Sequence, residues 1–429
     1  MIHNTEEKVL ESIEARREEL IELLRNLIRF RTVTPEIGER VEHEEFLRHQ
    51  EYIADQLGGL GLHTETWEID ASTLPRFPGC GVLPDRDMSR MPVVVGKLPG
   101  TGGGNSLILN GHYDVVPPGR IENWSHDPFG GIVEQGRIYG RGTCDMKGGL
   151  AAIITALRCL RDIGVKLKGE VTVQIVPDEE QTCMGTLACC QRGFRADAAF
   201  IPEPTDMQVL VAMRGSNYCR VTVTGRAGHA EEPQRPWRQG GAVNAISKAM
   251  KVLAALEELA ADWQNQPERQ HPLLEADTLK PTVIRGGQWT VTVPEEVEIQ
   301  FSGMHVPGSK GHAQAIQSTL DRLAKEDSWL RENPPILTMD ENLYGAEIPE
   351  SEDIVRESLQ ILSDLGLSIG VRGFGSLTDA VHLINYSKIP TVSIGPDIST
   401  AHSADEFITI DQLLDTTKVV ALTMLRWCG

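Results

Sequence analysis

Side chains that bind metal ions occur at five places where apolar segments of the sequence end. The places are His112, Asp145, the pair Glu179-Glu180, Glu203 and His402. In a parallel sheet the carboxyl ends of the strands form one binding edge, so residues far apart in the sequence can converge there. Two histidines with several carboxylates suit zinc or a related divalent transition metal.

The segment His112-Tyr113-Asp114 has the clearest local setting. It follows the apolar run Leu107-Ile108-Leu109-Asn110-Gly111, which is typical of a short buried strand. A metal could bind one nitrogen of His112 while Asp114 orients the ring through the other. Carboxylates that converge on such a point repel one another and shift their pKa values unless cations neutralise them.

Each of these residues also has a structural interpretation when it is taken alone. Asp145 would cap the helix that follows it, Glu179-Glu180 would form a solvated loop, and His402 would lie on the surface. Cys144 and Cys183 flank the acidic positions, and packing is favoured over a nucleophilic role for them. The coincidence of the five places favours a metal site.

Length and charge limit the class of protein. A chain of 429 residues is expected to form about two domains. With 41 basic and 61 acidic residues the net charge is −20, which argues against nucleic acid or an anionic membrane as a partner. No segment has the length of a membrane span, and the first residues lack the blocks of a signal peptide, so a cytoplasmic location is expected. Eight cysteines without a Cys-x-x-Cys pair indicate reduced thiols.

The segments that carry these residues alternate between strand and helix patterns. Helices are expected over an N-terminal segment from residue 4 and over 42–57, 147–164, 352–365 and 411–427. Strands are expected at 63–69, 93–95, 107–110, 170–176 and 390–394, with a hairpin over 131–139. This alternation predicts an α/β fold with a mostly parallel mixed sheet covered by helices on both faces.

A different order of elements follows residue 206. Strands near 218–224, 281–284, 293–301 and 336–339 and helices at 240–259 and 309–324 give the order βαββαβ, which is typical of a two-layer α+β unit. We therefore expect a discontinuous catalytic domain, residues 1–206 plus 342–429, and an inserted domain over 207–341.

Several motifs, in this order, resemble the zinc-dependent metallopeptidase family that includes acetylornithine deacetylase, succinyl-diaminopimelate desuccinylase, aminoacylase and the glutamate carboxypeptidases. The resemblance covers nearly the whole chain. The motifs are Gly111-His112-Tyr113-Asp114-Val115-Val116-Pro117, Trp124-Ser125-His126-Asp127-Pro128-Phe129, Gly140 to Gly149, Asp178-Glu179-Glu180, Pro202-Glu203-Pro204 and Ala401-His402-Ser403.

The resemblance implies two metal ions per subunit, zinc or else cobalt or manganese. Asp145 would bridge the two ions, His112 and Glu203 would complete one site, and Glu180 and His402 would complete the other. It further implies that Asp114 orients His112, that Asp145-Met146 is a cis peptide, and that Glu179 is the general base. A glutamate at position 203 goes with deacylases more than with peptidases.

The resemblance also implies that the inserted domain is ferredoxin-like and acts in dimerisation or as a lid. His229, in Gly225-Arg226-Ala227-Gly228-His229-Ala230, would donate a hydrogen bond to the oxyanion, often from the second subunit of a homodimer. The sequence alone favours an exposed loop histidine at this position.

Positions that bind substrate in the family differ in this chain. Val291, Met304 and Val381 stand where an asparagine, an arginine and a further arginine are common. Losing two arginines weakens the case for a substrate with an α-carboxylate. Arg214, Arg285 and Arg372 are candidates to replace them.

We therefore expect a di-zinc amidohydrolase that removes the acyl group of a small N-acylated amine or amino acid, with water activated by the metals and Glu179. An N-formyl or N-carbamoyl substrate without a plain α-carboxylate is an alternative. A dipeptidase or carboxypeptidase on the same scaffold is another, and a metal-containing binding protein without catalysis is less favoured because Glu179 is present.

Overall fold

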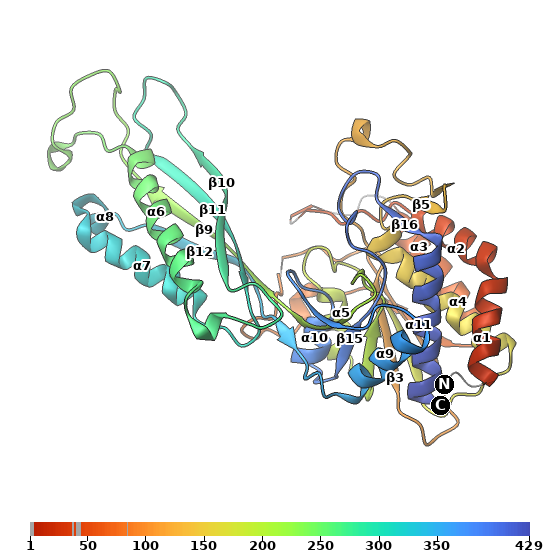
Figure 1. The fold of residues 1–429 in the computed structure, drawn as a ribbon. Coiled ribbons are helices and arrows are strands. Elements are labelled where there is room, and N and C mark those ends of the chain that lie inside the picture. Colours follow the sequence, from red (N-terminus) through yellow and green to blue (C-terminus); the bar gives the residue numbers. More distant parts are fainter. Residues whose placement is uncertain (1–3, 37, 40–43, 84) are drawn as a thin grey trace.

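The structure is a computed structural model that describes residues 4–36, 38–39, 44–83 and 85–429. The chain forms two bodies, each built on its own sheet, and the second projects away from the first (Figure 1). In the described part of the chain, no helix combines the length and apolar character that a membrane span needs.

The larger body contains a nine-stranded mixed sheet. Its order is β1-β2-β6-β3-β7-β15-β8-β13, and β14 pairs with β8. The central strands β6, β3, β7 and β15 are mutually parallel, whereas β1, β2, β8 and β13 make antiparallel pairs. The strands are β1 (His63–Trp67), β2 (Val93–Leu98), β3 (Leu107–His112), β6 (Val171–Val176), β7 (Ala198–Ile201), β8 (Val209–Met213), β13 (Ala346–Glu347), β14 (Val371–Phe374) and β15 (Thr391–Ser393).

Helices flank this sheet and bury its strands. Helices α4 and α11 pack against each other and on β3, α3 packs on β1 and β2, and α9 packs on β8 and β15. All residues of β3 and β6 are buried, as expected for parallel strands covered on both faces. The helices are α1 (Asn4–Ala15), α2 (Arg17–Arg29), α3 (Glu45–Gly59), α4 (Gly148–Asp162), α5 (Met184–Gln191), α9 (Asp353–Asp364), α10 (Ala380–Asn385) and α11 (Ile410–Cys428). The expected α/β fold class is confirmed.

Of three local expectations, one differs from the structure, one falls outside the described residues and one is confirmed. The N-terminal helical segment is interrupted at Arg16, where φ is −99° and ψ is 15°, so it forms α1 and α2. The start expected at residue 42 for the next helix lies outside the described residues. The hairpin at 131–139 forms and joins a third strand from far along the chain. This small sheet contains β4 (Ile132–Glu134), β5 (Arg137–Tyr139) and β16 (Phe407–Thr409).

The second body is a four-stranded sheet of order β10-β11-β9-β12 with its own apolar core. Its element order is the expected βαββαβ, with one additional short helix, α8. The elements are β9 (Gly215–Thr224), α6 (Ala245–Trp263), β10 (Thr278–Gly286), β11 (Glu296–His305), α7 (His312–Glu326), α8 (Ser328–Glu332) and β12 (Ile336–Leu343).

The chain passes between the two sheets at two short connections. The first lies between Met213 and Gly215, and the second lies between Leu343 and Ala346. The limits expected at 207 and 341 are each a few residues earlier. The first differs because β8 is not identified as a strand from the sequence, and the second because the strand expected at 336–339 extends to Leu343 as β12. The limits of the inserted domain stay a prediction, and sheet membership favours the later positions.

Candidate functional site

The five candidate ligand positions meet at the carboxyl edge of the large sheet. His112 is the last residue of β3, Glu179-Glu180 follow β6, and Glu203 follows β7. Asp145 lies in the turn before α4, and His402 lies in the loop between β15 and β16. Parallel strands that end side by side therefore bring together residues that are up to 290 positions apart (402 − 112).

Two glycines at the start of α4 allow close backbone contacts, Gly149 with the end of β7 and Gly148 with the turn that contains Asp145. A Cβ on Gly149 would lie 2.5 Å from the Pro202 carbonyl oxygen, and one on Gly148 would lie 2.4 Å from the Thr143 carbonyl oxygen. Only glycine permits such contacts without a shift of the backbone. The expected cis peptide Asp145-Met146 is present in the same turn.

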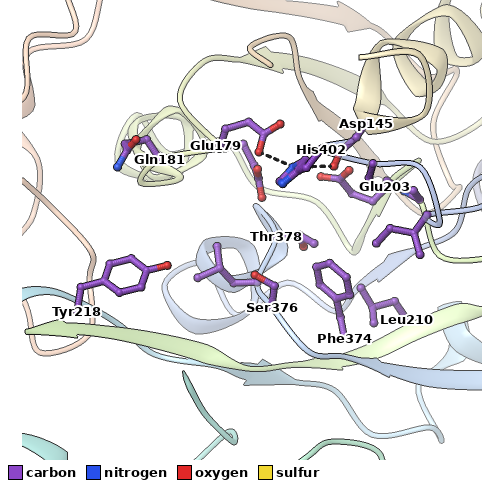
Figure 2. A pocket seen from close by; sticks show the side chains of 15 residues that line it. Asp145, Glu179, Gln181, Glu203, Leu210, Tyr218, Phe374, Ser376, Thr378 and His402 are labelled. Atoms are coloured by element: carbon purple, nitrogen blue, oxygen red, sulfur yellow. Dashed lines mark ion pairs between the residues drawn. The ribbon is translucent and has the colours of Figure 1, made fainter. Parts of the chain in front are cut away.

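The ligand atoms form two groups that share Asp145. His112 Nε2 lies 3.2 Å from Asp145 Oδ1 and 3.6 Å from Glu203 Oε1. On the other side, His402 Nε2 lies 3.4 Å from Asp145 Oδ2 and 3.0 Å from Glu180 Oε2. A dashed line in Figure 2 marks the pair of His402 and Asp145. Within each group the ligand atoms are all within 4.8 Å of one another.

Several observations show that this cluster fits divalent cations. The buried atoms Glu180 Oε1 and Glu203 Oε1 have no hydrogen-bond partner among the described residues. Burial, with the charge of Asp145, raises the pKa of Glu180 to about 7, and burial also raises the pKa of Glu203 well above its ordinary value. Such carboxylates need a nearby cation to remain charged at neutral pH. Together with the two histidines, they form a set of ligand atoms that can bind one. Imidazole nitrogens with carboxylate oxygens are ligands that zinc accepts.

Asp114 contacts both the histidine and the acidic turn. Its backbone carbonyl oxygen lies 2.9 Å from His112 Nδ1, whereas its carboxylate oxygen Oδ1 is 3.7 Å from that nitrogen. The carboxylate instead accepts hydrogen bonds from the backbone N–H groups of Glu179 and Glu180, at 3.2 and 3.3 Å. The expected contact with the ring thus comes mainly from the main chain of Asp114, and its side chain holds the turn.

Glu179 lies beside the cluster without belonging to either ligand group. Its Oε2 is 3.8 Å from His112 Nε2, and its side chain lines the main pocket. Burial raises the pKa of Glu179 well above its ordinary value, and the carboxylates of Glu203 and Glu180 add to the effect while His112 opposes it. A carboxylate with a raised pKa is suited to exchange protons near neutral pH.

The pocket next to the cluster has a volume of about 410 Å³ and two chemically different walls. Figure 2 shows Asp145, Glu179, Glu203 and His402 along one side, with Phe374 and Leu210 facing them. None of the described residues that line the pocket is arginine or lysine. The remaining lining residues are Glu180, Gln181, Pro204, Tyr218, Ser376, Leu377, Thr378, Ile398 and Ala401.

The three arginines considered as replacement anchors have other partners or lie elsewhere. Arg214 is buried and donates to Glu275, to Thr278 and to backbone carbonyls of the inserted domain. Arg372 pairs with Asp206, and Arg285 lines a separate hollow of the inserted domain. None of the three lines the main pocket.

His229 lies far from the cluster within one chain. It is exposed and follows β9, whose first residue adjoins the large sheet. A ten-residue strand rises about 3.3 Å per residue, so the two ends of β9 are roughly 30 Å apart. Within the chain, His229 is therefore not among the residues that line the pocket beside the cluster.

The candidate cysteines are packed inside the protein. Cys144 and Cys183 are both fully buried. Burial, with the neighbouring carboxylate of Glu406, raises the pKa of the Cys144 thiol well above its ordinary value. A buried thiol with a raised pKa is a poor nucleophile, which favours the packing interpretation.

The apolar wall of the pocket was not identifiable from the sequence. Leu210, Phe374 and Leu377 have the same residue types as the core, and no local pattern distinguishes them. Tyr218 comes from the inserted domain, so its approach to the pocket depends on how the two bodies are arranged.

The chain is similar to known proteins over most of its length. The chain is 30% identical to the N-formyl-4-amino-5-aminomethyl-2-methylpyrimidine deformylase of Bacillus subtilis, over 97% of this chain and 96% of the relative. It is 29% identical to the succinyl-diaminopimelate desuccinylase of Alkalilimnicola ehrlichii, over 74% of this chain and 83% of the relative.

The fold is also similar to that of a solved structure. The di-peptidase Dug1p from Saccharomyces cerevisiae superposes with a TM-score of 0.75 at 16% identity, covering 100% of this chain and 99% of that chain. This likeness concerns the fold alone. The model of the peptidase family M20/M25/M40 matches residues 108–426, a span that includes every candidate ligand. The chain therefore belongs to the peptidase family M20/M25/M40.

Proposed function

We propose that this protein is a hydrolase with two divalent metal ions per chain that cleaves the amide bond of a small N-acylated amine. The observation that carries the proposal is the pair of ligand groups that share Asp145, with Glu179 beside them in the pocket. His112, Asp145 and Glu203 would hold one ion, and Asp145, Glu180 and His402 would hold the other. Zinc suits these ligands best.

Different side chains carry out different steps of amide hydrolysis. When bound, divalent cations supply positive charge that lowers the pKa of a water molecule and polarises a carbonyl. Glu179 takes the proton of the attacking water and then delivers it to the nitrogen of the leaving amine. Asp114 fixes the backbone of the turn that presents Glu179. We expect the amine portion of the substrate to lie against Phe374 and Leu210, which form the apolar wall of the pocket.

The lining of the pocket favours a substrate without a carboxylate. A carboxylate is usually bound by arginine or lysine, and none lines the pocket among the described residues. The apolar wall suits a flat, uncharged group, and a similar protein from Bacillus subtilis is named as a deformylase of an aminomethylpyrimidine. We infer a formamide or related small acyl amide of such an amine. A dipeptidase or carboxypeptidase would need an anchor for the terminal carboxylate.

A substrate panel tests this specificity. We expect kcat/KM for an N-formylated aminomethylpyrimidine to exceed that for N-acetyl amino acids and dipeptides by at least about tenfold, which corresponds to about 1.4 kcal/mol. Release of formate or of the free amine measures each rate with the zinc-loaded protein. A preference for N-acetyl amino acids or dipeptides would contradict the inferred substrate class.

We also propose a homodimer formed through the inserted domain, in which each subunit supplies His229 to the other. Exposed apolar side chains on this domain support the proposal: Ile246 is 42% exposed, Met250 53% and Trp289 72%. A neighbouring copy could cover them, since exposed apolar residues that cluster often mark interfaces. The cytoplasmic location expected from the sequence stays a prediction.

Mixing two inactive variants tests the shared site. Glu179→Gln and His229→Ala should each be nearly inactive, because they remove the base and the oxyanion donor, the latter worth about 10²–10³ in kcat. After subunit exchange, a mixed dimer has one site with both native residues, so activity should reappear. Sedimentation should give the mass of a dimer. A monomer, or a mixture that stays inactive, would exclude the shared site.

A further inference from the structure

We propose that Arg86 is a positioning residue that holds the turn bearing Glu179 and Glu180 in place. Arg86 lies in the segment that precedes β2. The inference rests on the roles proposed above for Glu179 and Glu180. Its basis is the buried ion pair between Arg86 and Asp178, the residue directly before Glu179.

Most of the hydrogen-bond donor groups of the Arg86 side chain have an acceptor. Its side chain is fully buried, and Nε and Nη2 donate to Asp178 Oδ1 at 3.1 and 2.5 Å. Its Nη1 donates to the carbonyl oxygens of Pro35 and Glu36, at 2.9 and 3.0 Å. Arg86 therefore ties the acidic turn to a segment that follows α2.

Asp178 is fixed at several points by these and other bonds. Its second carboxylate oxygen accepts a hydrogen bond from the Thr182 hydroxyl. Its carbonyl oxygen accepts from the backbone N–H groups of Thr182 and Cys183, at 2.9 and 2.8 Å. Asp178 has φ of 71°, a left-handed conformation that non-glycine residues rarely adopt unless their surroundings hold them there.

Two carboxylates, those of Asp114 and Asp178, thus hold the turn. Asp114 accepts from the N–H groups of Glu179 and Glu180, and Arg86 holds Asp178, the residue directly before them. Glu180 belongs to one metal-ligand group only, whereas the group of His112, Asp145 and Glu203 contains no residue of this turn. Loss of Arg86 should therefore affect the base and one metal site while sparing the other.

The test uses Arg86→Met in the full-length protein, with zinc content and kinetics measured after dialysis. We expect zinc to fall from about two ions per chain to about one, and kcat to fall by roughly tenfold or more while KM changes little. Arg426→Met is the matched control. Arg426 forms a largely buried ion-pair cluster with Glu6 and Asp364 away from the pocket, so its loss should lower thermal stability and leave kcat and zinc content unchanged.

A double variant separates positioning from stability. Arg86→Met with Asp178→Asn leaves no unpaired buried charge, so we expect it to regain thermal stability. It should nevertheless keep the low kcat and the loss of one zinc ion, because the link to Pro35 and Glu36 is still broken. Full recovery of kcat in the double variant would overturn the proposal. So would an Arg86→Met protein that retains both ions and wild-type kcat.

Arg86→Lys keeps the fold and the charge while reducing the number of donors, and we expect an intermediate kcat. If the native protein hydrolyses no amide, the proposed function fails, and the zinc content of the variants still tests the positioning role.

Discussion

Glu179→Gln is expected to lower kcat by roughly 10²–10⁴ while the protein keeps its metal ions. The amide has nearly the shape of the carboxylate but cannot take a proton from water, so the reaction loses its base. Glu179 is not a member of either ligand group, which is why metal content should be unaffected. Steady-state kinetics and metal analysis on the same preparation measure both effects.

Two other glutamates provide the controls. Glu180→Gln removes a ligand instead of the base, so it should lose metal as well as activity. Glu295→Gln alters an exposed residue of the inserted domain and should change neither. If Glu179→Gln retained wild-type kcat, the assignment of the base would be wrong.

Asp145→Asn is expected to abolish activity by releasing both metal ions, because Asp145 is the residue common to both ligand groups. Neutralising it removes the negative charge that each ion would share. Glu203→Gln and His402→Ala, which each alter one group, should lose mainly one ion. Metal content per chain after dialysis distinguishes these outcomes.

Asp411→Asn is the matched control for this substitution, since the Asp411 side chain is 86% exposed at the start of α11. It should keep both ions and full activity. An Asp145→Asn protein that retained two ions would show that Asp145 does not bridge them.

The positions of the candidate ligands were accessible from sequence because their signals are local. A short apolar run followed by glycine or proline marks the end of a buried strand, and such ends meet at one edge of a parallel sheet. His112 and Glu203 illustrate this, since β3 and β7 are neighbours in the sheet. The family resemblance added the order of the motifs, and the family match agrees with it.

Features that depend on contacts between distant segments were not accessible from sequence. Residues 209–213 form an apolar run that could belong to a strand or to any other part of the core. They join the large sheet by pairing with β14 and β15. In the sequence Phe374 resembles a core residue, and only its position in the wall of the pocket distinguishes it. Arg86 meets Asp178, which is 92 residues away, through a loop without a periodic pattern.

Metal analysis of the purified protein, before and after chelation, is the decisive test of the two-metal site. We expect about two divalent ions per chain, no amide hydrolysis after their removal, and recovery of activity when zinc is restored. Amide hydrolysis by a protein shown to be free of metal would contradict it.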